Sequence, residues 1–233
     1  VMGKAAWDLL PMNLYRAHNW HCLHDLKHRG NYAAIYTAYG CPFSCDFCNV
    51  KTQYPKYTPR PVKEVADEIE RLVKEYGVRN LKLCDELFTV NTERVTELCE
   101  RIQDFKLNIW AYARVGTVNE KMLKAINKAG INWLAYGFES FSQDVRGNKK
   151  YKGEDETIKI TREAGINIMG NFIFGLDNDT EETMKYTLNR AKSYLFEYVN
   201  FYVAMPYPGS SLWNDSMSTD WGRYNQYSHN PIG

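Results

Sequence analysis

Three closely spaced cysteines are the residues of this chain with the clearest capacity for chemistry. Cys41, Cys45 and Cys48 fall within eight residues, with three residues between the first two and two between the last two. This spacing places three thiolates on one short loop, and soft thiolates select iron–sulfur clusters or zinc. A cubane cluster needs four ligands, and ferredoxin-type sites supply four cysteines. With three local cysteines one iron stays open, and an open coordination position is typical of a reactive metal site.

Two other interpretations of the cysteine loop compete with a cluster. A structural zinc site would need a fourth ligand such as Cys22 or His28, but the spacing differs from the usual paired C-x2-C motif. Alternatively, the cysteines could be small buried apolar side chains. The neighbouring Pro42, Asp46 and Asn49 make that alternative less favoured.

The overall composition narrows the class of protein. The 233 residues include 29 basic and 28 acidic side chains, so the net charge of +1 gives no signal for nucleic acid or an anionic membrane surface. No run of eighteen apolar residues predicts a membrane span, and residues 1–11 lack the features of a signal peptide. Clustered cysteines favour a metal site in a reducing compartment over disulfides. The sequence therefore predicts a cytoplasmic protein.

From residue 31 onward, β-branched or aromatic runs alternate with amphipathic segments. We expect strands at Tyr32–Ala38, Leu81–Cys84, Asn108–Ala113, Trp133–Gly137, Asn167–Phe174 and Tyr198–Ala204. We expect helices at Pro61–Tyr76, Thr92–Gln103, Glu120–Ala129, Asp155–Ala164 and Glu181–Tyr194. Strict alternation favours parallel strands joined by helical crossovers.

The number of units predicts the architecture and its functional edge. Six strands and five intervening helices indicate an α/β fold, a partial (β/α)6 TIM-like barrel with parallel strands or an open doubly wound sheet. In either arrangement the chemistry belongs at the carboxyl ends of the strands. We expect a lead-in segment at 1–30, the barrel at 31–206 and an irregular segment at 207–233.

With aromatic Phe47 just before the last cysteine, the cysteine loop resembles the signature of the radical S-adenosylmethionine (SAM) superfamily. The resemblance implies a [4Fe–4S] cluster whose open iron is chelated by S-adenosylmethionine. It implies reductive cleavage of S-adenosylmethionine to a 5′-deoxyadenosyl radical, which abstracts hydrogen from a substrate. It also implies that Phe47 lies near the adenine.

Further matches to this superfamily follow the other strands. Cys84–Phe88 stands where the family carries its Gly-Gly-Glu-like motif, which implies contacts from Asp85 and Glu86 to the amino group of S-adenosylmethionine. Tyr207–Gly209 resembles the end of the sixth strand. Several such motifs in the family's order are more specific than the cysteines alone.

The middle strands add two more elements. Tyr136–Ser140 looks like the Gly-x-Glu-Ser element, which implies a place for Glu139 near the ribose or methionine moiety. Gly170–Gly175, with Phe174, is similar to the segment that runs along the adenine. A buried carboxylate needs a partner, and we expect a ligand amine or Arg114 to provide it for Glu139. Arg114 could instead pair with a carboxylate of S-adenosylmethionine or substrate.

The subtype that the sequence most resembles is the cobalamin-binding branch of the superfamily. Its likeness rests on the barrel pattern together with Trp7–Leu10, Tyr15–Arg16 and Asn19–Trp20. That branch carries a corrinoid domain with an Asp-x-His-x-x-Gly motif, whereas Asp25, His28 and Gly30 have the wrong spacing. Either the chain is part of a methyltransferase whose corrinoid domain is supplied elsewhere, or it is a cobalamin-independent relative.

Partners and a rival function complete the expectations. The resemblance implies an external one-electron donor of the flavodoxin or ferredoxin type and a small-molecule or peptide substrate. The rival function is a non-catalytic iron–sulfur or zinc protein that serves electron transfer or assembly. We interpret four histidines between residues 18 and 28 as the polar face of a lead-in helix, because no carboxylate is set among them as in a His-Glu-x-x-His site.

Overall fold

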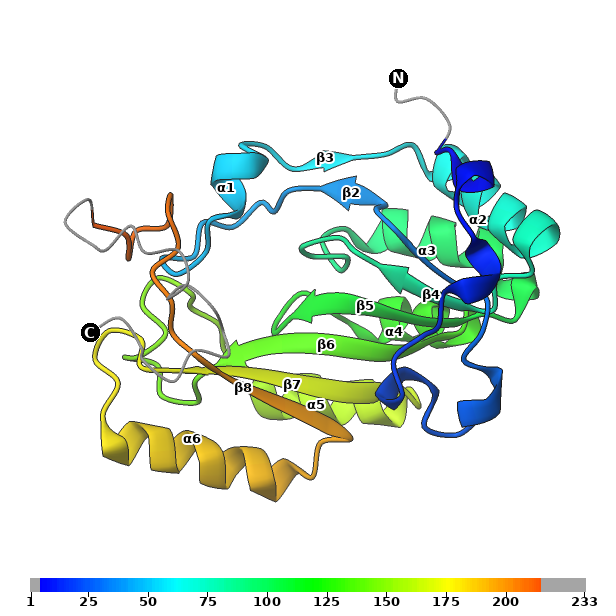
Figure 1. Ribbon diagram of the computed structural model, residues 1–233. Helices are drawn as coiled ribbons and strands as arrows, with labels where there is room; N and C mark the ends of the chain where they lie inside the picture. The colour runs from blue at the N-terminus through cyan, green and yellow to red at the C-terminus, as the bar shows by residue number, and fades with distance from the viewer. Residues whose placement is uncertain (1–4, 215–233) are drawn as a thin grey trace.

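In the computed structural model, which describes residues 5–214, six parallel strands form one curved sheet (Figure 1). In spatial order the strands are β1 (Tyr32–Ile35), β4 (Asn80–Leu83), β5 (Asn108–Arg114), β6 (Ile131–Glu139), β7 (Asn167–Phe174) and β8 (Tyr198–Val203). Every neighbouring pair is parallel. In the part of the chain described, β1 and β8 form the two edges, so the sheet is an open, partial barrel. The predicted (β/α)6 architecture is confirmed.

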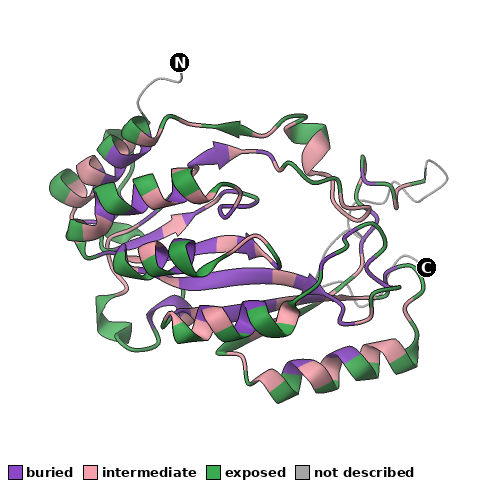
Figure 2. Cartoon of the chain, turned by 180° about the vertical axis from the view of Figure 1, so that it is seen from behind, coloured by how far each residue is buried: buried purple, intermediate pink, exposed green. Residues whose placement is uncertain are grey.

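Five helices connect consecutive strands and cover one face of this sheet (Figure 1). They are α2 (Val62–Tyr76), α3 (Thr92–Ile102), α4 (Glu120–Lys128), α5 (Glu154–Glu163) and α6 (Glu181–Tyr194), and their ends match the predictions within one residue. In α2, Val65, Ile69 and Leu72 form the buried stripe that its periodicity predicts. Figure 2 shows such stripes facing the sheet while the opposite helix faces are exposed.

Local capping explains why the helix boundaries were visible in the sequence. The Asn91 side chain accepts a hydrogen bond from the Arg94 amide, and Asn119 caps the start of α4 in the same way. Gly130 follows α4 with φ of +81°, and a Cβ there would lie 2.0 Å from the Leu107 carbonyl oxygen. Only glycine can therefore make this tight entry into β6.

The segment around the cysteines contains structure that the sequence pattern did not predict. The first expected strand is split, since β1 ends at Ile35 and β2 (Ala38–Tyr39) turns away to pair antiparallel with β3 (Thr58–Pro59). Between them the chain forms the cysteine loop and the short helix α1 (Val50–Gln53). The cysteine loop therefore extends from a two-stranded ribbon at the rim of the barrel.

The lead-in segment is not the helix we expected. It consists of the single 3-10 turns η1 (Trp7–Leu9), η2 (Met12–Leu14), η3 (Trp20–Cys22) and η4 (Leu26–His28). His24 and His28 consequently share no helix face, and exposed His28 pairs with Asp25 at 2.6 Å. Aromatic contacts with the sheet, rather than the regular hydrogen bonds of a helix, hold this segment in place.

Trp20 anchors the lead-in segment against the inner face of the sheet. Its ring centroid lies 5.1 Å from that of Trp110 and 5.4 Å from that of Trp133, both in edge-to-face geometry. Trp110 and Trp133 lie near the amino ends of β5 and β6. The aromatic cluster thus fills one end of the barrel and leaves the carboxyl ends of the strands for a site.

No helix within residues 5–214 is long and apolar enough to cross a bilayer. The expected irregular segment 207–233 is described only to residue 214, and up to there it contains neither helix nor strand. Its remainder, 215–233, lies outside the described residues.

Candidate active site at the cysteine loop

A cavity of about 440 Å³ lies between the cysteine loop and the carboxyl ends of the barrel strands. This volume is within the ~300–1,000 Å³ range typical of ligand pockets. The residues predicted for the site that line the cavity are Cys41, Cys45, Cys48, Phe47, Glu86, Arg114 and Glu139. The structure therefore gathers at one place side chains that are up to 98 residues apart in the chain.

The three thiols occupy a partly buried loop with cationic neighbours. The Cys48 amide donates to the Cys45 carbonyl oxygen at 3.0 Å, which closes a turn between two of the cysteines. Burial raises the pKa of the Cys41 and Cys48 thiols above the ordinary value. The Arg114 guanidinium donates to Cys45 Sγ at 3.4 Å, and Lys51 Nζ donates to the Cys41 carbonyl oxygen at 2.6 Å. These cations favour a group that brings net negative charge to the loop.

The chemical type of the ligand atoms, rather than their meeting at a single point, indicates which metal group the cysteine loop could hold. Within residues 5–214, no three His, Cys, Asp or Glu side chains converge as ligands of one metal ion. In a cubane cluster each cysteine binds a different iron atom, so the sulfurs need not meet at one point. Three thiols bordering one cavity fit three irons of such a cluster, and no fourth cysteine is among the described residues that line it.

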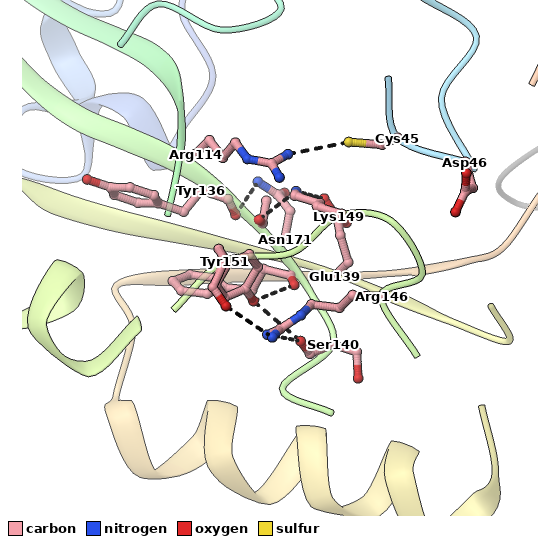
Figure 3. A network of polar contacts seen from close by, with 12 residues as sticks. Cys45, Asp46, Arg114, Tyr136, Glu139, Ser140, Arg146, Lys149, Tyr151 and Asn171 are labelled. Carbon is pink, nitrogen blue, oxygen red and sulfur yellow. Dashed lines mark hydrogen bonds and ion pairs between the residues drawn. The ribbon is translucent and has the colours of Figure 1, made fainter. Parts of the chain in front are cut away.

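A buried ion pair between Glu139 and Lys149 lines the same cavity as the three thiols. Figure 3 shows this pair together with Cys45. Lys149 Nζ lies 2.5 Å from Glu139 Oε1 and donates to the Gly137 carbonyl oxygen at 2.7 Å. Glu139 and Lys149 are only 7% and 6% exposed. The pairing of β6 with β7 shifts register between Gly137 and Glu139, and Glu139 has φ of +61°. This irregularity re-aims the Glu139 side chain at the end of its strand.

The structure corrects our expectation for the partner of Glu139. Lys149 makes the pair, whereas Arg114 contacts Cys45 and lies 4.1 Å from the centre of the Phe43 ring. Lys149 follows β6 in a loop with a second lysine, Lys150, and no sequence pattern distinguished the two. The only available signal was the need of a buried carboxylate for a cation.

Two predicted residues lie away from the cavity lining. Asp85 is 1% exposed and accepts hydrogen bonds from the Thr37 amide and hydroxyl, both at 2.5 Å. Burial raises the pKa of Asp85, and these hydrogen bonds oppose that shift. Phe174 instead lies beside Phe201, with ring centroids 5.1 Å apart. Asp85 thus fixes the chain after β1, and its neighbour Glu86 faces the cavity.

Asn171 is a cavity residue that sequence reasoning missed. Its Nδ2 donates to the Tyr136 carbonyl oxygen at 3.3 Å, and its Oδ1 accepts from Asn200 Nδ2 at 3.0 Å. Alternation along β7 contained the signal, because Asn171 and Ile173 line the cavity while Phe172 and Phe174 point to the other side.

The match to a family model defines the class of protein. Residues 35–191 match the model described as the radical SAM superfamily, which covers more than half of the chain. The chain therefore belongs to the radical SAM superfamily, as the cysteine loop and the strand-end motifs predicted.

Two curated proteins of the comparison are similar to this chain in sequence over most of its length. An uncharacterized methyltransferase of Pyrococcus horikoshii is 31% identical over 94% of this chain and 48% of its own length. The anaerobic magnesium-protoporphyrin IX monomethyl ester cyclase of Cereibacter sphaeroides is 34% identical over 81% of this chain and 33% of its own length. The chain thus spans about half, or less, of the length of these relatives.

Solved structures support the fold. The radical S-adenosylmethionine methyltransferase TsrM from Kitasatospora setae, with cobalamin and a [4Fe–4S] cluster bound, matches with a TM-score of 0.70 at 20% identity. The match covers 79% of this chain and 36% of that one. Coproporphyrinogen III oxidase from Escherichia coli matches with a TM-score of 0.60 at 17% identity, over 78% of this chain and 46% of that one.

Proposed function

We propose that this chain is the radical-generating domain of an enzyme that cleaves S-adenosylmethionine reductively. Cys41, Cys45 and Cys48 would hold a [4Fe–4S] cluster. The observation that carries the proposal is that one cavity is bordered by these three thiols and by the buried Glu139–Lys149 pair. A cluster in this place would supply one electron to break a carbon–sulfur bond of S-adenosylmethionine, giving methionine and a 5′-deoxyadenosyl radical that takes hydrogen from a substrate.

The charged residues of the cavity suit the amino-acid part of S-adenosylmethionine. That part carries an ammonium and a carboxylate, and the cavity offers a carboxylate on Glu139 and an ammonium on Lys149. A zwitterion can exchange partners with an existing ion pair, so no buried charge is left alone when it binds. Glu86, which follows β4, provides a second carboxylate toward the cavity.

Three further residues of the cavity have proposed roles in holding S-adenosylmethionine and the cluster. Phe47 offers a ring face for the adenine, and Asn171 offers an amide oriented by the Tyr136 carbonyl and by Asn200. Arg114 holds a positive charge beside Cys45 and so favours the anionic cluster-bound form of the loop.

Three finer assignments belong to the same proposal. The electron comes from an external one-electron donor of the flavodoxin or ferredoxin type, the substrate is a small molecule or peptide, and the enzyme works in the cytoplasm. Residues 31–206 form the catalytic barrel, with residues 1–30 as a lead-in and 207–233 as a C-terminal segment.

A cobalamin-dependent methyl transfer is the second candidate function. It is favoured by the similarity to the Pyrococcus horikoshii methyltransferase and by the fold shared with TsrM. It requires a corrinoid domain from chain beyond this sequence or from another protein, because the Asp-x-His-x-x-Gly motif is absent here.

The test is anaerobic reconstitution with iron and sulfide, followed by S-adenosylmethionine and dithionite. We expect about four irons per chain and release of 5′-deoxyadenosine. Replacing Cys41, Cys45 or Cys48 with serine should abolish both, whereas Cys84→Ser, at a half-buried free cysteine outside the cavity lining, should abolish neither.

The outcomes separate the alternatives. Iron binding without 5′-deoxyadenosine would favour a carrier or assembly protein over an enzyme. One zinc per chain held by the same cysteines would refute the cluster. Adding methylcobalamin to the active protein and seeking a methylated product tests the second candidate.

A further inference from the structure

The cysteine loop is bound tightly to a loop that lies about 100 residues later in the chain. The Asp46 amide donates to Asn148 Oδ1 at 3.0 Å, and the Asn148 amide donates back to Asp46 Oδ2 at 3.0 Å. Asn148 Nδ2 also donates to the Ser44 carbonyl oxygen at 2.5 Å. These three hydrogen bonds, which we call the Asp46–Asn148 brace, connect the residues on either side of Cys45 to the loop that follows β6.

Asp46 connects several segments because its amide, carboxylate and carbonyl oxygen are all hydrogen-bonded to residues far away in the chain. Its amide and carboxylate bind Asn148, and its carbonyl oxygen accepts from the Ser211 amide at 2.9 Å. Three separate segments of the chain therefore meet at the residue next to Cys45. Such convergence limits the positions that the cysteine loop can take.

Close packing adds to the hydrogen bonds. Gly147 has φ of +54°, and a Cβ at this position would lie 2.6 Å from Asp46 Oδ2. The backbone of the later loop thus approaches the Asp46 carboxylate so closely that a side chain at position 147 would push this carboxylate away from Asn148. Gly153, in the same loop, also has a positive φ of +80°, but a Cβ there would meet nothing within 4 Å.

The loop that the brace holds also carries Lys149. This residue directly follows Asn148, and its ammonium reaches Glu139 in the cavity. The brace therefore connects the two sides of the proposed site: the three thiols and the ion pair. We propose that the Asp46–Asn148 brace sets the separation between the cluster-holding loop and the Lys149–Glu139 pair, and so positions the amino-acid part of S-adenosylmethionine. This inference rests on the proposed function, with Asp46 and Asn148 as positioning residues.

The test compares Asn148→Ala and Gly147→Ala with two matched controls. Gly153→Ala imposes the same kind of backbone strain without a clash. Asn127→Ala removes a side-chain hydrogen bond to the Gly165 carbonyl oxygen, at a place far from the cysteines in sequence. In the brace variants we expect release of iron to a chelator to be roughly fivefold to tenfold faster. Asn148→Ala removes two solvent-exposed hydrogen bonds, and this factor corresponds to their small combined net contribution. The controls should match the unaltered chain.

A positioning role also predicts a specific kinetic signature. In fully reconstituted samples with equal iron content, Asn148→Ala should raise KM for S-adenosylmethionine several-fold while the maximal rate of 5′-deoxyadenosine release changes little. Asp46→Asn keeps an oxygen that can accept from the Asn148 amide and should restore most of what Asp46→Ala loses. In the Asp46→Ala background, Gly147→Ala should cost no more than Gly153→Ala does, because the clash is gone.

A measurement on the metal-free chain keeps this test independent of the proposed function. Alkylation of Cys45 and Cys48 by iodoacetamide, followed by peptide mass spectrometry with Cys84 as internal reference, should be several-fold faster in the two brace variants. If the unaltered chain binds no iron, the proposed function fails while the alkylation rates still decide the brace. Equal alkylation rates, iron loss and KM in brace and control variants would overturn the inference.

Discussion

Removing the ammonium of Lys149 should destabilise the fold, because it leaves the Glu139 carboxylate buried without a partner. The two side chains are 2.5 Å apart and less than 10% exposed. Breaking a buried pair by removing one partner typically costs 3–5 kcal/mol. Because both groups border a cavity that can admit water, we expect Lys149→Met to cost about 3 kcal/mol, the lower end of that range. For a domain of this size that corresponds to a melting temperature roughly 6–12 °C lower.

The double variant makes this prediction specific to charge. Glu139→Gln together with Lys149→Met leaves no charge in the pair, so most of the lost stability should return, to within about 1 kcal/mol of the original chain. Lys150→Met, at the exposed neighbouring lysine, should change stability by less than about 0.5 kcal/mol. Anaerobic guanidinium titrations measure the metal-free forms of the original chain, Lys149→Met, Glu139→Gln, the double variant and Lys150→Met. Simple additivity of the two single variants, or a neutral Lys149→Met, would show that the pair is not a stabilising unit.

Three further outcomes follow from the structure. Burial lowers the pKa of His21 from 6.5 to about 4, and its ring nitrogens have no hydrogen-bond partner within the described residues. The unfolded chain therefore binds the proton more readily, so stability should fall by up to about 3 kcal/mol as the pH drops from 6.5 to 4. His21→Phe should flatten that pH profile in urea titrations. Asp85→Asn should lower stability by about 1–3 kcal/mol, since it disturbs a buried hydrogen-bonded carboxylate. Glu86→Gln should leave stability within about 0.5 kcal/mol and weaken only S-adenosylmethionine binding in equilibrium dialysis, a division that equal effects at both positions would contradict.

The barrel could be predicted from the sequence because its signals are local. Helix α2, for example, is indicated by the spacing of Val65, Ile69 and Leu72 and by Gly77 at its end, and the start of α6 is indicated by Thr180, whose side chain accepts from the Thr183 amide. Strand β1 was predicted too long, to Ala38, because β-branched and aromatic composition cannot show where a strand leaves one sheet for another. Pairing of β2 with β3 is a tertiary choice made across the whole cysteine loop.

The lead-in segment shows the opposite case, in which contacts outside the segment decide its structure. Its four histidines suggested a polar helix face, yet the buried ring of His21 and the Trp20 contacts with Trp110 hold a series of 3-10 turns instead. Residues about 90 positions away in the chain provide those contacts. No pattern within the segment itself could have indicated them.

The residues of the candidate site fall into two groups: those at strand ends could be predicted from the sequence, and those in loops could not. Residues fixed by a strand end, such as Glu139, could be placed from the sequence, since the carboxyl ends of parallel strands meet at one edge. Lys149 could not, because its place depends on hydrogen bonds between its loop and the cysteine loop. The sheet thus determines which carboxylates face the cavity, while contacts between loops determine which cations reach them. Substitution of Asn148, an exposed residue of the loop after β6, should therefore change ligand affinity while leaving the barrel's stability nearly unchanged, whereas substitution of the buried Lys149 should change both.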